Sequence, residues 1–88
     1  MTIEDLRKRI DAVDEQLVAL LNTRALCAIE IGRLKRAGGL PIYQREREQD
    51  VLRRAMAQTE RLGGPLTPDA IARLFERIID EARQLENG

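Results

Sequence analysis

Histidine is absent from this chain of 88 residues, and cysteine occurs once, as Cys27. These absences exclude a disulfide within the chain, a zinc cluster of ordinary ligand spacing, and any Ser/His or Cys/His nucleophile pair. We therefore expect no metal site and no nucleophile activated by histidine. Cys27 itself belongs to a helical apolar pattern, which predicts a small, buried hydrophobic side chain.

Excess charge of either sign is also missing, because 15 basic and 15 acidic residues balance to zero. Non-specific nucleic-acid binding needs a broad basic surface, so no nucleic-acid partner is expected and any positive site must be local. The chain has no apolar run of membrane-spanning length, and it does not open on a basic segment followed by an apolar one. These features predict a soluble, cytoplasmic protein without a membrane partner.

The chain does contain a long apolar seam, found by counting from Leu6 in alternating steps of four and three residues. The seam consists of Leu6, Ile10, Val13, Leu17, Leu20, Arg24, Cys27, Ile31 and Leu34. Arg24 is its only charged member. Removing a lone guanidinium from water is costly unless an anion meets it, so the seam predicts either a carboxylate partner or an anionic ligand beside Arg24. Alternatively, Arg24 only sets helix register and oligomeric state.

Further cations and small residues accompany Arg24 along the same predicted helix. Arg7 and Lys35 each directly follow a seam residue, four heptads apart. Ala28 and Gly32 place two small side chains between Arg24 and Lys35. Glycine inside a helix costs about 1 kcal/mol relative to alanine, so Gly32 indicates that backbone or ligand comes close there. Together these residues favour a binding site for an anion.

Three helices and no strand-like alternation account for nearly all of residues 1–88, which predicts a single all-α domain. The first helix is expected over 2–36, from an N-cap threonine to a pair of glycines. The second is expected over 44–61. The third begins at Thr67-Pro68-Asp69, which supplies an N-cap, a first-turn proline and an acidic residue. The expected apolar faces of the second and third helices comprise Val51, Leu52, Ala55, Met56, Leu62, Ile71, Leu74, Phe75, Ile78, Ile79 and Ala82.

The first helix is too long for a compact chain of this size. About 35 residues at 1.5 Å each give ~52 Å, whereas a compact globule of 88 residues has a diameter of roughly 30 Å. The seam therefore requires a second chain. We expect an intertwined helical homodimer in which the long helices pair and the shorter helices wrap across the partner.

Two acidic residues also lie on the apolar faces. Glu48 shares the inward face of the second helix, and Arg47 borders it, although the mixed charge run around them is also typical of solvated surface. Glu86 continues the apolar face of the third helix, although its closeness to the last residue also suits a frayed end.

These residues together carry a resemblance to the all-helical class of chorismate mutases, over Leu6 to Glu86. The matching segments are Asp14-Glu15, Leu20-Leu21, Arg24, Glu30 to Lys35, Pro41-Ile42, Arg45 to Glu48, Leu74-Phe75 and Ile78-Ile79. The resemblance implies an intertwined homodimer of three-helix chains with sites shared between chains. It also implies that the substrate is the dicarboxylate chorismate, which is converted to prephenate for phenylalanine and tyrosine biosynthesis without a cofactor.

The resemblance also implies a role for each site residue. Arg24 and the partner chain's Arg7 would bind the substrate carboxylates, and Lys35 would donate to the ether oxygen and one carboxylate. Glu48 would accept from the ring hydroxyl, with Arg47 orienting it. Catalysis would rest on Lys35, Arg24 and Glu86, the last at the place where relatives commonly present a glutamine to the ether oxygen.

Three positions depart from the family pattern. Gln44 stands where many members have aspartate near the hydroxyl, Ala82 replaces a small polar residue seen in some, and Glu86 replaces the amide. Two other functions stay open on sequence alone. An isochorismate pyruvate-lyase of the same fold would use a similar cationic pocket. A non-catalytic helical dimerisation or regulatory module would instead pair Arg24 with an acidic residue.

Overall fold

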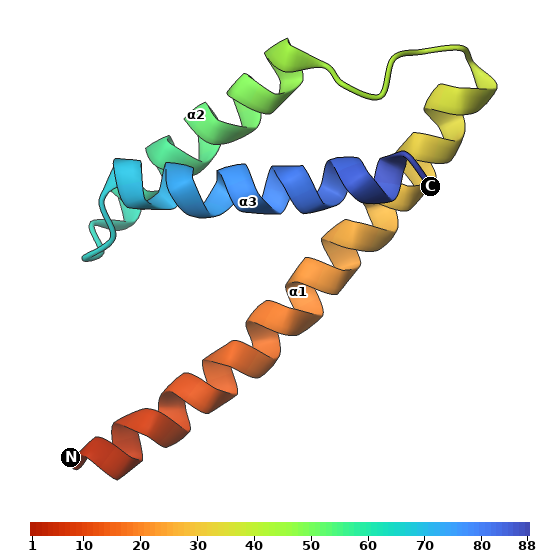
Figure 1. Ribbon diagram of the computed structural model, residues 1–88. Coiled ribbons are helices and arrows are strands. Elements are labelled where there is room, and N and C mark those ends of the chain that lie inside the picture. Colours follow the sequence, from red (N-terminus) through yellow and green to blue (C-terminus); the bar gives the residue numbers. More distant parts are fainter.

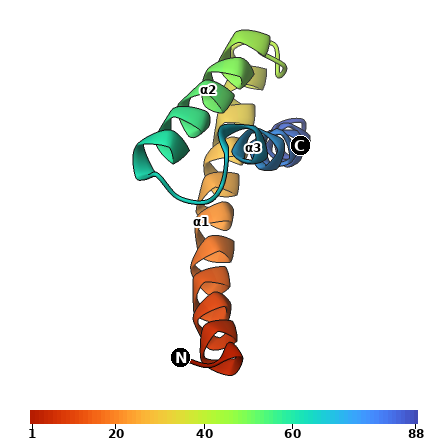
Figure 2. The same cartoon turned by 90° about the vertical axis from the view of Figure 1, so that its left-hand side faces the viewer.

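The computed structural model describes residues 1–88 as three helices, α1 (Ile3–Ala37), α2 (Arg45–Leu62) and α3 (Pro68–Glu86), and no strand. Helix α3 packs against both α1 and α2, whereas α1 and α2 make no packing contact with each other (Figure 1). The N-terminal half of α1 extends away from the other two helices (Figure 2). The chain measures 55 × 24 × 16 Å, which confirms that α1 is too long for a compact globule. None of the helices is apolar enough over a sufficient length to cross a membrane.

Local sequence signals explain where the helices begin and end. The Thr2 hydroxyl accepts from the Asp5 N–H at 3.1 Å, and the Asp5 carboxylate accepts from the Thr2 N–H at 3.1 Å, which completes a capping box. The Thr67 hydroxyl caps α3 by accepting from the Ala70 N–H. Gly63 ends α2 with φ +66°, a left-handed conformation that glycine adopts without steric cost. The predicted helices are confirmed, and α1 and α2 each continue one residue further than expected.

One member of the predicted apolar face of α2 was assigned wrongly. Leu62, the last residue of α2, is 84% exposed. The buried stripe continues instead from Ala55 to Thr59, one turn later. The Thr59 hydroxyl donates to the Leu66 carbonyl oxygen at 2.9 Å, which satisfies this buried polar group and ties the end of α2 to the turn before α3.

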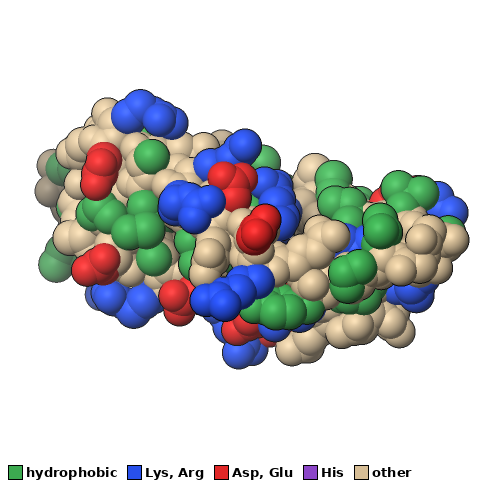
Figure 3. Space-filling model, turned by 90° about the horizontal axis from the view of Figure 1, so that it is seen from above, with side chains coloured by type: hydrophobic (Ala, Val, Ile, Leu, Met, Phe, Trp, Pro, Cys, Tyr) green, Lys and Arg blue, Asp and Glu red, His purple; other side chains and the backbone are tan.

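A single chain leaves most of its apolar surface uncovered. Only five of the 88 residues are buried. Seven seam residues of α1 are between 42% and 67% exposed: Leu6, Ile10, Val13, Leu17, Leu20, Ile31 and Leu34. The face shown in Figure 3 likewise exposes hydrophobic side chains among interspersed acidic and basic ones. An exposed apolar stripe of this length is typical of a surface that another chain covers.

Gly32 allows the end of α3 to approach α1 closely. A Cβ atom at this position would lie 2.6 Å from the Glu86 Cα and 2.9 Å from the Glu86 carbonyl carbon, closer than atoms can pack. The neighbouring Arg36 guanidinium donates to the Glu86 carbonyl oxygen. The close approach expected from the sequence is therefore an approach of backbone, and it sets the position of the last turn of α3.

The Gly32→Ala variant should be less stable than the natural chain. The added methyl group must displace the backbone of α3, and such overpacking costs roughly 1–3 kcal/mol, more than the ~1 kcal/mol that alanine contributes to the helix. Thermal or urea unfolding measures the difference. Gly64→Ala is the matched control, because nothing lies within 4 Å of a Cβ at Gly64. A Gly32→Ala variant at least as stable as the control would contradict the close packing of α1 and α3.

Candidate functional site

Residues from all three helices line a cavity of about 480 Å³. This volume is within the usual range for small-molecule sites. Its walls come from the C-terminal half of α1, the start of α2 and the last turns of α3. Twelve residues line it: Arg24, Cys27, Ala28, Ile31, Lys35, Gln44, Arg47, Glu48, Val51, Ile79, Ala82 and Glu86. All the predicted site residues except Arg7 are therefore among its walls.

Arg7 lies far from this cavity in the same chain. It precedes Lys35 by 28 residues on the continuous helix α1, which corresponds to ~42 Å at 1.5 Å per residue. The part of α1 that carries Arg7 extends away from α2 and α3 (Figures 1 and 2). One chain by itself does not place Arg7 in the cavity.

Arg24 is half-buried and has no acidic partner within the chain. No carboxylate lies within ion-pair distance of its guanidinium. Arg24 lines the large cavity and also a second, mainly apolar cavity of about 320 Å³ between α1 and α3. The carboxylate partner allowed by the sequence is therefore not found inside one chain, and the guanidinium is available to an anion.

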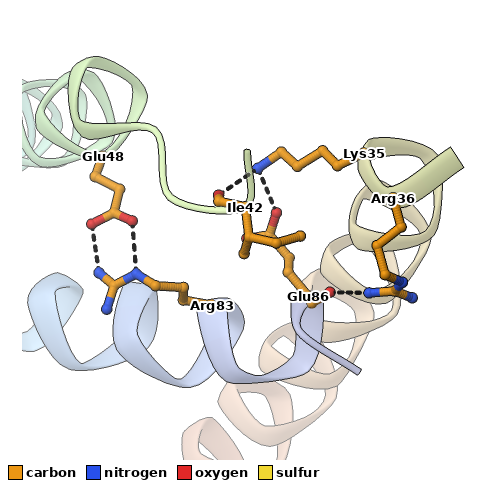
Figure 4. A network of polar contacts seen from close by, with 6 residues as sticks. All are labelled: Lys35, Arg36, Ile42, Glu48, Arg83 and Glu86. Atoms are coloured by element: carbon orange, nitrogen blue, oxygen red, sulfur yellow. Dashed lines mark hydrogen bonds and ion pairs between the residues drawn. The ribbon is translucent and has the colours of Figure 1, made fainter. Parts of the chain in front are cut away.

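Lys35 and Glu86 form an ion pair at the end of the cavity where α1 meets α3. The Lys35 Nζ donates to the Glu86 Oε1 at 2.6 Å and to the Ile42 carbonyl oxygen at 3.0 Å (Figure 4). The two side chains are only 13% and 15% exposed. Glu86 is the last residue of α3 and is held by this pair, so the alternative of a frayed, solvated glutamate is wrong.

Glu48 projects from the first turn of α2 and is held by an arginine that the sequence analysis did not select. Arg83 of α3 donates from its Nε to Glu48 Oε2 at 3.0 Å, and from its Nη2 to Glu48 Oε1 at 2.6 Å (Figure 4). Arg47, which was expected to orient Glu48 and the neighbouring substrate groups, forms no ion pair with Glu48 in this chain. The Arg47 side chain is 61% exposed, and its guanidinium contacts Asp50, three residues away on the same helix, at 3.1 Å.

Two further residues show what sequence spacing can and cannot reveal. Arg83 follows the buried Ile79 by four residues on α3, so its place on the inward stripe was detectable, whereas its carboxylate partner on another helix was not. Cys27 was expected to be buried, but it is exposed in the chain and lines the cavity. The reason is that α3 covers only part of the seam of α1.

The cavity combines fixed positive charge with neutralised acids. Arg24, Arg47 and Lys35 supply positively charged hydrogen-bond donors to the wall. The two carboxylates of the wall are already paired, Glu86 with Lys35 and Glu48 with Arg83. The hydrogen bond to Glu48 raises the pKa of Arg83 above its ordinary value, so this guanidinium remains charged. Apolar groups from Ile31, Val51 and Ile79 complete the walls. Such a site suits a small molecule with carboxylate groups and a hydroxyl group.

Comparison with known proteins gives consistent matches over nearly the whole chain. The profile of the family described as chorismate mutase type II matches residues 6–87. A bifunctional chorismate mutase/prephenate dehydratase of Aquifex aeolicus is 34% identical over 96% of this chain and 24% of its own length. A T-protein of Enterobacter agglomerans is 40% identical over 93% of this chain and 21% of its own length. The chain thus spans about a quarter of these relatives.

A solved structure extends the similarity to the fold. Chorismate mutase (form II) from Thermus thermophilus superposes with a TM-score of 0.89 and 36% sequence identity, covering 96% of this chain and 92% of that one. This similarity confirms the predicted all-α class and the order of the three helices.

Proposed function

This chain belongs to the chorismate mutase type II family, and we propose that it converts chorismate to prephenate, a step toward phenylalanine and tyrosine. The observation that carries the proposal is the cavity that Arg24, Lys35 and Arg47 line together with Glu48. Chorismate has two carboxylates, an ether oxygen and a ring hydroxyl, and arginine and lysine are the donors that such a dianion requires.

The proposed chemistry is an intramolecular rearrangement in which one carbon–oxygen bond breaks as one carbon–carbon bond forms. It needs no nucleophile and no proton relay, which agrees with a chain that lacks histidine. Binding would hold the enolpyruvyl arm over the ring in a reactive conformation, which removes an entropic part of the barrier. Donors fixed beside the ether oxygen would stabilise the negative charge that grows there as the bond breaks.

Individual residues then have separate tasks. Arg24, together with Arg7 from a second chain, binds the two carboxylates. Lys35 donates to the ether oxygen and to one carboxylate, and Glu48 accepts from the ring hydroxyl. Gln44 and Arg47 supply further hydrogen-bond donors from the start of α2. Ala82 contributes an apolar side chain to the cavity wall.

The working protein is proposed to be an intertwined homodimer. The exposed seam of α1 and the apolar cavity formed by Leu21, Ala25, Ile78, Ala82 and Leu85 leave one chain with little buried core. A two-fold pairing of the α1 helices would cover these surfaces on both chains. It would also bring the Arg7 of each chain toward the Arg24 and Lys35 of the other. Light scattering or analytical ultracentrifugation tests this state.

The loss of chorismate absorbance with purified protein tests the proposed activity. Turnover of chorismate to prephenate supports it. Release of pyruvate from isochorismate, without turnover of chorismate, would assign the chain to the lyase chemistry of the same fold. If a folded dimer turned over neither substrate, the remaining alternative would be a non-catalytic helical module.

Glu86→Gln should keep or raise kcat/KM. The Glu86 carboxylate pairs with Lys35 at 2.6 Å, so it occupies a donor proposed for the ether oxygen and would oppose the negative charge that grows there. A glutamine amide can instead donate a hydrogen bond to that oxygen.

Measuring kcat/KM for both proteins under the same conditions gives the comparison. Glu81→Gln is the matched control, because Glu81 lies on the same helix in an exposed pair with Arg77 and should leave kcat/KM unchanged. A large loss of kcat/KM in Glu86→Gln would show that the carboxylate itself is required and would contradict this prediction.

A further inference from the structure

We propose that Arg83 is a positioning residue that holds Glu48 at the cavity wall and balances its charge, an inference that rests on the function proposed above. Arg83 itself is not among the residues that line the cavity. It lies on α3 and donates to both oxygens of the Glu48 carboxylate, at 3.0 and 2.6 Å (Figure 4). This two-point geometry restricts both the location and the plane of the carboxylate.

Neighbours from two further parts of the chain restrict the Arg83 guanidinium in turn. Its central carbon lies 5.3 Å from the centre of the Tyr43 ring, in the segment before α2, which is a cation–π distance. Its Nη1 lies 3.3 Å from the Asp80 Oδ1, one turn earlier on α3. Arg83 therefore has a defined position, set by Glu48 of α2, Asp80 of α3 and Tyr43 in the segment that joins α1 to α2.

The pair resolves an electrostatic conflict in the site. A cavity for a dianion is an unfavourable place for a carboxylate, because the like charges of Glu48 and the substrate repel. Arg83 places a permanent positive charge against the Glu48 carboxylate, although only Glu48 of the pair lines the cavity. A carboxylate has about four acceptor positions and Arg83 uses two, so Glu48 can still accept a hydrogen bond from a substrate hydroxyl.

Arg83→Met should lower kcat/KM by roughly 10- to 100-fold, the size expected when a group that positions substrate is displaced by about 1 Å. Arg83→Lys restores the charge without the two-point contact and should recover part of the loss. Arg73→Met is the matched control: Arg73 is exposed on the same helix and takes part in none of the ion pairs of the chain, so kcat/KM should be unchanged. Circular dichroism confirms that each variant is folded at the assay temperature.

A double-mutant cycle with Glu48→Gln separates positioning from a general structural effect. If Arg83 acts through Glu48, Arg83→Met should cost much less in the Glu48→Gln background than in the natural one. Equal losses in both backgrounds would overturn the proposal, because they would show that Arg83 acts independently of Glu48.

The pair can also be observed without turnover. In ¹⁵N-labelled protein, the Arg83 Nε–H should exchange slowly with solvent and should lose this protection in Glu48→Gln. Rapid exchange in the natural protein would overturn the proposal whether or not chorismate is consumed. A protected Nε–H in a protein that does not turn over chorismate would reject the proposed function and, with it, the positioning role, while leaving the ion pair itself established.

Discussion

Arg24→Leu should leave the proposed dimer folded and remove nearly all of the proposed chorismate mutase activity. Leucine completes the apolar seam of α1, and replacing a partly buried charge with a hydrophobic side chain is often neutral or stabilising. Arg24 has no carboxylate partner in the chain, so its removal leaves no acid unpaired. Loss of a charged donor that acts in the transition state should cost roughly 10²- to 10³-fold in kcat/KM.

Stability and turnover must be measured on the same preparation. Unfolding in urea measures the stability of the protein, and sedimentation measures its association into a dimer. Chorismate consumption measures the activity of the site. Arg33→Leu is the matched control on α1, because Arg33 is exposed, pairs only with Glu30 and lines no cavity. Ordinary turnover by a stable Arg24→Leu dimer would make Arg24 a determinant of helix register and would remove the main support for the proposed site.

Arg7→Ala and Lys35→Ala should each be almost inactive as homodimers and should regain activity when they are unfolded and refolded together. Arg7 lies ~42 Å from Lys35 along α1, so a site that uses both must take them from different chains. In a heterodimer one site then carries both lesions and the other carries neither. Random pairing of equal amounts should restore roughly a quarter of the natural activity.

A second mixture controls for nonspecific recovery. Lys35 and Glu48 line the same cavity of one chain, so every site in a Lys35→Ala and Glu48→Gln heterodimer carries one lesion. That mixture should stay inactive. If the Arg7 and Lys35 variants form heterodimers without regaining activity, the sites are not shared between chains.

The helices of this protein could be predicted closely because their signals are local. Thr2 and Thr67 cap helices through atoms three residues away, and Gly63 ends α2 through its own backbone conformation. The length of α1 and its seam also follow from spacing alone, and the exposed seam of the single chain agrees with the need for a second one. The placement of Arg24, Lys35 and Glu48 beside one cavity follows from their helix faces once the helices pack.

Pairings between helices were less predictable. The family resemblance implied that Arg47 orients Glu48, but neighbours on a helix point in different directions and Arg47 contacts Asp50 instead. The partner of Glu48 is Arg83, 35 residues away. The assignment of Leu62 to the apolar face was wrong for a related reason, since helical spacing does not show where the neighbouring helix stops covering a face.

The sequence by itself determined three helices, their caps, an α1 too long for one globule, and a set of cations on apolar faces. Only the tertiary structure decided that α3 lies against Gly32, that Lys35 pairs with Glu86 across 51 residues, and that Arg83 holds Glu48. The physical reason is range. Capping and amphipathic spacing act within one or two turns of a helix, whereas an ion pair between helices depends on how closely and at what angle their backbones meet.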